Sequence, residues 1–245
     1  MEQDAFFKYL DNGFDSIEGW SGNRNSVAFM AIFRELFNRS SEVGGACEIG
    51  VHHAKYLIAI HNLLGGEHRS LGMDLFKEQE KNIDGSGGGD EYICTKNINI
   101  YARNPELITL ASVDSISLTL AETLSIKKEF GSFRFFSIDG GHTPVHLVHD
   151  FMIASECTSP IGLIAIDDLF NPDWPGVTEG IYKLVSAGTS SFVPLFLTRK
   201  KLFLCHLSVR YEYMRFLGNY CGNVAHKVVS FFGNDVLSLN FGAEY

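Results

Sequence analysis

The chain of 245 residues lacks the features that would place it in a membrane or secreted class. It has no apolar run of the roughly 18 residues that a membrane-spanning helix needs. Its first residues, Met1-Glu2-Gln3-Asp4, are acidic and unlike a secretory signal peptide. We therefore expect a cytoplasmic protein with no membrane partner.

Positive charge is also scarce. The chain has 20 Lys and Arg against 29 Asp and Glu, and its formal net charge is −9. Binding to a phosphate backbone depends on clustered Lys and Arg side chains. Nucleic acid is therefore not expected as a partner.

Cysteine is too sparse for a disulfide framework or a thiolate zinc site. The five cysteines are odd in number, widely spaced and without a CxxC pair. We expect Cys47, Cys157 and Cys205, which adjoin apolar segments, to be small core residues.

What is present is the composition of one large α/β domain, with 45% hydrophobic and 20% charged residues. Helical periodicity in residues 1–40 predicts an N-terminal helical cap or lid. Residues 41–245 form the α/β domain in this prediction.

From residue 41 strands and helices alternate. Strands are predicted at 45–50, 69–75, 107–113 and before Asp139 and Asp167, and helices at 54–64, 91–103, from 115 and at 143–157. This alternation predicts a doubly wound, mostly parallel, Rossmann-like sheet with helices on both faces.

The C-terminal tail has a different pattern. Two apolar runs, 191–197 and 201–205, are separated by only Thr198-Arg199-Lys200, which suits an antiparallel hairpin and is too short for a crossover helix. We therefore expect an antiparallel last strand, with residues 235–239 as a rival for that position.

Two predicted strands end abruptly on carboxylates. One run ends in Ile138-Asp139-Gly140-Gly141-His142 and the other in Ile166-Asp167-Asp168. Because the carboxyl ends of parallel strands face the ligand crevice, Asp139, His142, Asp167 and Asp168 should converge there.

The earlier strands carry acids at the same edge. Glu48 and Gly50 lie at the first strand-to-helix turn, Asp74 ends the second strand, and Asp114-Ser115 follow the third. Glycine allows a sharp turn and close approach of a ligand, and an acid after the second strand can accept hydrogen bonds from a ribose diol. The pattern is typical of a nucleoside-binding site.

These residues resemble the motifs of class I S-adenosylmethionine-dependent methyltransferases. Phe136-Ser-Ile-Asp139-Gly-Gly-His142 and the run from Ile166 to Gly180 resemble their metal-dependent, small-molecule O-methyltransferase branch. The resemblance implies that S-adenosylmethionine is bound with Glu48 near its methionine portion, Asp74 on its ribose and Asp114 near its adenine. Gly50 and Ser115 are expected beside them. His53-Ala54 departs from the family, which has a further glycine there.

Carboxylates at Asp139, Asp167 and Asp168 would repel one another unless a hard cation such as Mg²⁺ lies between them. The resemblance implies such a metal site, with His142 as the base that takes the proton of an acceptor hydroxyl. The acceptor is expected to be a small hydroxylated molecule, such as a sugar or a natural-product intermediate. The acidic pair could instead cap a helix or anchor a loop, and His142 could merely cap the helix that follows it.

Several alternatives stay open. An NAD-dependent dehydrogenase shares the acid after the second strand, but only Gly50 of its G-x-G-x-x-G fingerprint is present. A non-catalytic binding protein and a zinc site at His142, His146 and His149 are further alternatives. Residues 84–90, rich in glycine, are expected to form a flexible surface loop, with a phosphate-binding loop as the secondary reading because no Lys-Ser/Thr follows them. A homo-oligomer is compatible with the sequence.

Trp174, in the loop after the acidic pair, could form a wall of the acceptor pocket or seal the core. Trp20, Phe29 and Phe33 of the N-terminal segment could close the other side of the pocket or pack in the core.

Overall fold

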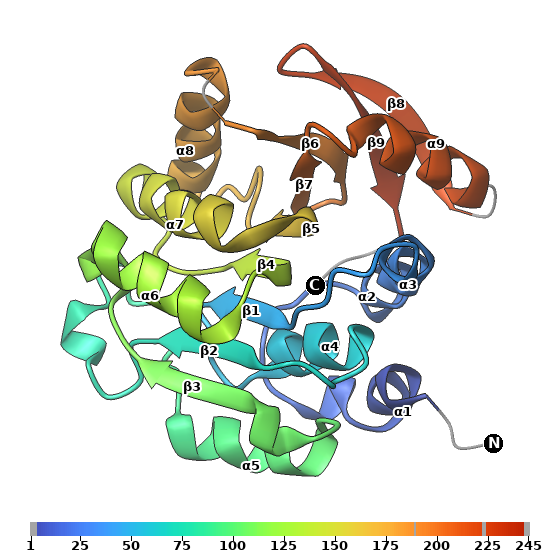
Figure 1. The fold of residues 1–245 in the computed structure, drawn as a ribbon. Coiled ribbons are helices and arrows are strands. Elements are labelled where there is room, and N and C mark those ends of the chain that lie inside the picture. The colour runs from blue at the N-terminus through green and yellow to red at the C-terminus, as the bar shows by residue number, and fades with distance from the viewer. Residues whose placement is uncertain (1–3, 189, 222–223, 243–245) are drawn as a thin grey trace.

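A single mixed sheet runs through the molecule. The computed structural model describes residues 4–188, 190–221 and 224–242, and within them nine strands are ordered β3-β2-β1-β4-β5-β7-β6-β9-β8 (Figure 1). The strands are β1 (Ala46–Ile49), β2 (Ser70–Asp74), β3 (Ile108–Ser112), β4 (Phe133–Ile138), β5 (Thr158–Ile166), β6 (Phe192–Leu197), β7 (Leu202–His206), β8 (Ala225–Phe231) and β9 (Asn234–Asn240).

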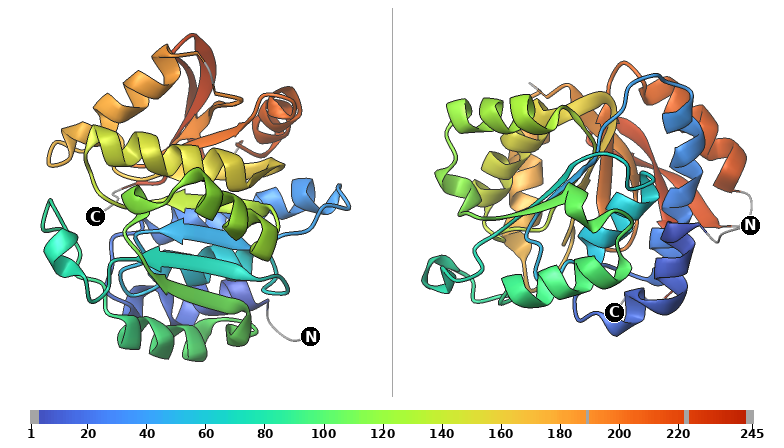
Figure 2. Two further views of the ribbon diagram at one scale, coloured as in Figure 1. Left: turned by 60° about the vertical axis from the view of Figure 1, so that its left-hand side comes forward. Right: turned by 60° about the horizontal axis from the view of Figure 1, so that its bottom comes forward.

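Helices cover both faces of this sheet (Figure 2). They are α1 (Ala5–Asn12), α2 (Arg24–Phe29), α3 (Phe33–Asn38), α4 (Lys55–Leu63), α5 (Glu91–Tyr101), α6 (Leu120–Phe130), α7 (Pro144–Cys157), α8 (Pro175–Ser186) and α9 (Arg210–Tyr220). None of the described helices is long and apolar enough to cross a membrane.

Strands β1 to β5 are parallel. Glu48 lies opposite Ser137, and Ile138 lies opposite Ile166. Parallel pairing brings the carboxyl ends of these strands to one edge, where the arrowheads of β1, β2 and β3 point in Figure 1. The predicted doubly wound sheet is confirmed, and its carboxyl edge is the place for a ligand.

The tail adds four strands. β7 is antiparallel to β5 and to β6, so the short connection at Thr198 forms the expected hairpin. Residues 235–239 belong to a further strand, β9, which lies parallel to β6 and carries antiparallel β8 at the edge. The two candidates for the last strand are therefore both strands of the sheet.

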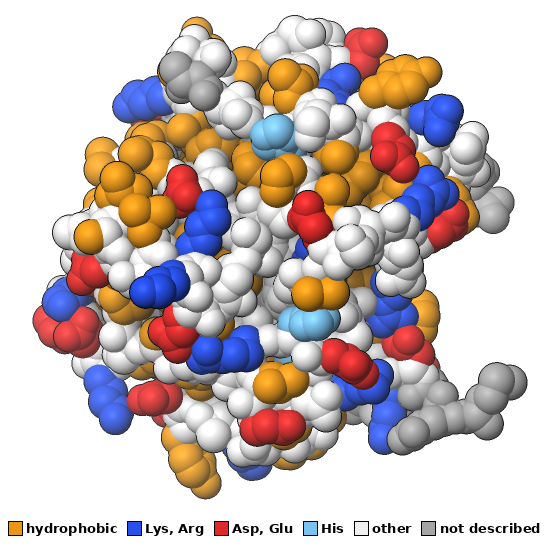
Figure 3. Space-filling view, viewed as in Figure 1, with side chains coloured by type: hydrophobic (Ala, Val, Ile, Leu, Met, Phe, Trp, Pro, Cys, Tyr) orange, Lys and Arg blue, Asp and Glu red, His pale blue; other side chains and the backbone are white. Residues whose placement is uncertain are grey.

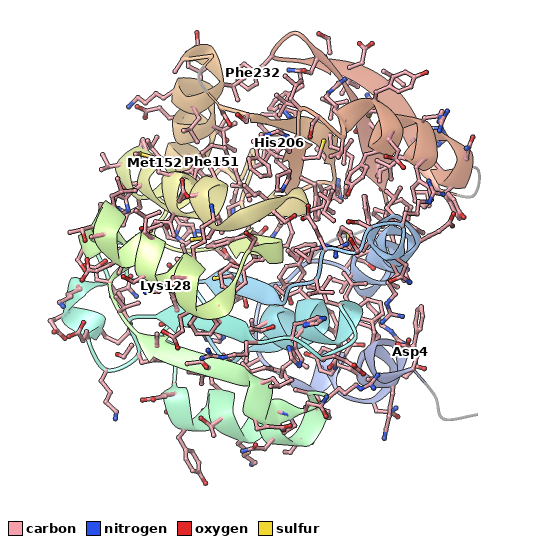
Figure 4. The ribbon with its side chains drawn as sticks, in the orientation of Figure 1. Asp4, Lys128, Phe151, Met152, His206 and Phe232 are labelled. Carbon is pink, nitrogen blue, oxygen red and sulfur yellow. The ribbon has the colours of Figure 1, made fainter. Side chains whose placement is uncertain are left out.

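Successive side chains of a strand point to opposite faces, and each face has its own core. On β4, Phe135 belongs to the cluster under α1 to α5 and α9, whereas Phe136 belongs to the cluster under α6 to α8. On α7, Phe151 is buried in the second cluster while its neighbour Met152 is exposed (Figure 4). Exposed apolar side chains gather over this helix (Figure 3).

The N-terminal helices share their core with the sheet. Phe33 is fully buried and stacks on Phe196 of β6 at 5.7 Å between ring centroids, and Phe29 contacts the same ring edge-on. Both phenylalanines therefore pack in the core, and a division of the chain at residue 40 stays a prediction. Cys47, Cys157 and Cys205 are also buried, as expected of small core residues.

Candidate active site

A cavity of about 620 Å³ opens at the carboxyl edge of the sheet. Its lining comes from the turns after β1, β2, β3 and β4, from Asp168 after β5, and from the segment between β2 and α5. Of the predicted site residues, the lining includes Gly50, Asp74, Asp114, Ser115, Asp139, His142 and Asp168.

The turn after β1 requires glycine at position 50. Gly50 has a φ of +82°, and a Cβ atom there would lie 1.8 Å from the carbonyl oxygen of Asp139. Ala54, at the start of α4, also has a positive φ of 66°. The backbone of this turn thus passes directly against the end of β4, which joins the two halves of the site.

Asp74 fixes the same turn. Its Oδ2 accepts a hydrogen bond from the backbone N–H of His52 at 2.8 Å, and its Oδ1 accepts one from Phe76 at 3.1 Å. Asp114 and Ser115 lie in the same cavity after the neighbouring strand β3. The predicted cofactor residues at the ends of β2 and β3 are therefore brought together.

Glu48 is outside the described lining of the cavity. It is 2% exposed, and burial raises the pKa of its carboxyl to about 8, although Lys201 opposes this shift. Its neighbours on β1, Cys47 and Ile49, belong to the core under α6 to α8. Because side chains alternate along a strand, Glu48 points to the opposite face of the sheet.

Asp139, His142 and Asp168 form one cluster, and one ligand atom from each lies within 4.8 Å of the others. Burial and the nearby Asp167 raise the pKa of Asp139 well above its usual range. Excess negative charge of this kind favours a cation, and carboxylate oxygens are the ligands of hard divalent ions. The donor set fits such an ion.

The other acid of the pair, Asp167, lies near Asp139 but is outside the described ligand group and pairs with Lys201. Its Oδ2 accepts a hydrogen bond from Nζ of Lys201, and both side chains are at most 7% exposed. Burial works against the charge on Lys201, but the Asp167 carboxylate outweighs it and raises the lysine pKa. Of the three carboxylates predicted to meet, the described structure groups two, and Asp167 has a protein cation as its partner.

His142 is held on three sides. Its Nε2 lies 3.1 Å from Oδ2 of Asp168, its Nδ1 lies 2.8 Å from Oδ2 of Asp84, and its ring stacks on Trp174 at 4.3 Å between centroids. Burial opposes protonation of the imidazole, but the hydrogen bonds to Asp168 and Asp84 prevail and raise its pKa. The ring orientation is therefore fixed.

Sequence reasoning missed two members of this site. The glycine-rich segment does not simply cover the surface, because Asp84, Gly85, Ser86 and Gly87 line the cavity. In Figure 1 this segment lies at the carboxyl edge of the sheet, between β2 and α5. Lys201, the buried partner of Asp167, was the other residue that the sequence did not predict. An acid within a run of glycines was the available signal for Asp84.

Other predicted features divide between the site and the core. Trp174 lines the cavity and also packs against the second core, and its role at an acceptor stays a prediction. Trp20 also lines the cavity, and its ring centroid lies 5.4 Å from that of His52. Nδ1 of His146 is 2.7 Å from Oγ1 of Thr143, and the described metal-ligand group contains His142 without His146 or His149.

No protein-family model matches the sequence, and no curated protein matches it. Solved structures do match. The O-methyltransferase NovP is 12% identical with a TM-score of 0.58, over 75% of this chain and 80% of that one. CalS11, a TDP-rhamnose 3'-O-methyltransferase of calicheamicin biosynthesis, is 16% identical with a TM-score of 0.53, over 81% and 86%.

A third match is MycE, a methyltransferase of the mycinamycin pathway solved with Mg and S-adenosylhomocysteine. It is 15% identical with a TM-score of 0.54, over 84% of this chain and 55% of that one. At these identities the likeness is one of fold. This chain has the Rossmann-like fold of the small-molecule O-methyltransferases.

Proposed function

We propose that this protein transfers a methyl group from S-adenosylmethionine to a hydroxyl group of a small molecule. The observation that carries the proposal is that one cavity of about 620 Å³ is lined both by Gly50, Asp74 and Asp114 and by the cluster of Asp139, His142 and Asp168. Its volume is in the range of small-molecule sites. The fold it shares with O-methyltransferases supports the same reaction.

Asp139 and Asp168 are the residues that would hold a divalent cation such as Mg²⁺. Asp167 stays a predicted third ligand, paired with Lys201 in the present arrangement. When bound, the ion would act as a Lewis acid that makes an acceptor hydroxyl more acidic. A hard ion prefers oxygen ligands, which leaves the imidazole of His142 for proton transfer.

His142 would accept the hydroxyl proton at Nε2, the nitrogen that lies near Asp168. As that proton leaves, the oxygen forms a bond to the methyl carbon, and the carbon–sulfur bond breaks with its electron pair returning to sulfur. With Asp168 among the residues that would hold the cation, Nε2 of His142 would be free to act as the base. Trp174 keeps the ring in place by stacking.

Two neighbouring structures and the walls of the cavity suggest a class of acceptor. CalS11 is described as a TDP-rhamnose 3'-O-methyltransferase, and MycE belongs to mycinamycin biosynthesis. Trp20 and Trp174 give the cavity of this chain flat apolar surfaces beside its polar groups. We infer a sugar or a natural-product intermediate as the acceptor.

Calorimetry with S-adenosylhomocysteine and with NAD tests the proposal. S-adenosylhomocysteine should bind and NAD should not, because the G-x-G-x-x-G turn for a diphosphate is missing. Asp74→Ala should weaken the binding of S-adenosylhomocysteine at least tenfold. Binding of NAD alone would favour the dehydrogenase, and binding of neither would favour a non-catalytic protein on this fold.

A further inference from the structure

Asp84 reaches into the site from the segment between β2 and α5. Its Oδ2 accepts a hydrogen bond from the backbone N–H of His142 at 2.9 Å and lies 2.8 Å from Nδ1 of the same residue. The side chains of Asp84 and His142 are 11% and 10% exposed. A loop that is 58 residues away in sequence thus supplies a nearly buried partner for the proposed base.

Hydrogen bonds within the loop hold the carboxylate of Asp84 in place. Oδ1 of Asp84 accepts hydrogen bonds from the backbone N–H and the hydroxyl of Ser86, at 3.1 and 2.7 Å. Nδ2 of Asn82 donates to the carbonyl oxygen of Ser86 at 2.6 Å. Gly85 and Gly87 take positive φ angles of 67° and 49°, which glycine adopts without strain. Both oxygens of Asp84 are therefore engaged, one by its own loop and one by His142.

We propose that Asp84 is a positioning residue for His142, which keeps a proton on Nδ1 and so leaves Nε2 as the nitrogen that takes the acceptor's proton. This inference rests on the proposed function. An imidazole with a carboxylate on one nitrogen has a fixed tautomer and ring orientation, and the imidazolium formed in the reaction is stabilised. The hydrogen bond to the backbone N–H of His142 fixes Asp84 in turn.

The proposed base and its positioning residue therefore come from different parts of the sheet. His142 follows β4, whereas Asp84 follows β2, whose end carries the predicted ribose acid Asp74. The glycine-rich segment is then part of the catalytic site.

Asp84→Asn tests the proposal, because an amide at this position can donate to Nδ1 and favour the wrong tautomer. With a panel of hydroxylated acceptors, kcat should fall by roughly 10²- to 10⁴-fold, with KM for S-adenosylmethionine changed by less than about threefold. Glu80→Gln, an exposed acid of the same segment outside the described cavity lining, is the matched control and should keep wild-type kcat. Asp84→Asn added to His142→Gln should cause no further loss.

A second readout needs no acceptor. In ¹⁵N spectra of the histidine rings at pH 8, Nδ1 of His142, assigned by its loss in His142→Gln, should be protonated in the wild type and unprotonated in Asp84→Asn. An unprotonated Nδ1 in the wild type, or the same Nδ1 state in both proteins, overturns the inference. So does an active wild type whose kcat survives Asp84→Asn. An inactive wild type that binds no S-adenosylhomocysteine instead refutes the proposed function, and the spectra still decide the role of Asp84.

Discussion

Lys201 and Asp167 form a buried ion pair on the face of the sheet opposite the second core. The Nζ atom of Lys201 donates to Asp167 and lies 4.4 Å from the centre of the Tyr56 ring. The charge of Lys201 also favours the ionised forms of Glu48 and Asp139, against the burial that raises the pKa of each. The positive charge of Lys201 thus acts on three carboxyls, and one of them, Asp139, lines the cavity.

Removal of this ammonium group should destabilise the fold. Lys201→Met leaves Asp167 buried without a cation, and loss of one partner of a buried pair costs about 3–5 kcal/mol. Urea unfolding of the variant should show this loss. The double variant Lys201→Met/Asp167→Asn should recover much of it, and a single variant as stable as wild type would show that the pair is dispensable.

Substitution of Gly50 should disrupt both the fold and the cofactor site. In Gly50→Ala the new Cβ would clash with the carbonyl of Asp139 at a positive φ, so we expect a loss above about 3 kcal/mol and no binding of S-adenosylhomocysteine. Thermal unfolding and calorimetry measure the two effects. Gly218→Ala is the control. This exposed glycine of α9 has open space around it, and the change should stabilise by about 0.5–1 kcal/mol.

A divalent cation should stabilise the protein through the acidic cluster. A ligand that binds only the native state at a concentration of 100 Kd adds about 2.7 kcal/mol to the free energy of unfolding. Mg²⁺ should therefore raise the Tm of the wild type, EDTA should reverse the rise, and Asp168→Asn should abolish it. Asp173→Asn changes an acid of the same cavity outside the cluster and should keep the response. If Mg²⁺ raised the Tm of Asp168→Asn as much as that of the wild type, the ion would not bind at this cluster.

Asp150 should make stability depend on pH. It is fully buried on α7, and burial raises the pKa of its carboxyl to about 7. A carboxyl whose pKa is higher in the folded state than in the unfolded state, near 3.8, stabilises the fold at low pH, and this contribution is lost as pH rises through 7.

The difference in Tm between Asp150→Asn and the wild type isolates this effect from other titrations. The Tm of Asp150→Asn should rise relative to that of the wild type as the pH is raised from 5 to 8. A difference that stays constant over this range would show that Asp150 does not titrate there.

The sheet and most of the cavity were predictable from the sequence because they depend on local pattern. Apolar strands that stop on acids, and a glycine after β1, follow from periodicity and turn chemistry, and the parallel order then gathers Asp74, Asp114 and Asp139 at one edge. Asp167 and Asp168 follow the end of β5, where Asp168 has a positive φ of 58°, and the two neighbouring carboxylates contact different partners, Lys201 and His142.

The partners of these acids depend on the path of the chain and were not predictable. Lys201 lies beside Asp167 because β7 returns antiparallel to β5 with Leu202 opposite Ile166, a register that the sequence pattern leaves open. Asp84 meets His142 because a loop of small residues folds back across the sheet edge.

The two tryptophans of the chain, Trp20 and Trp174, both line the cavity, although they are far apart in the sequence. Trp174 lies against the proposed base and Trp20 against the turn after β1. All of the indole fluorescence of the protein therefore originates at the wall of the candidate site. Entry of a nucleoside or of an acceptor ring can be followed optically in the unmodified protein, and replacement of either tryptophan by phenylalanine assigns the signal to one side of the cavity.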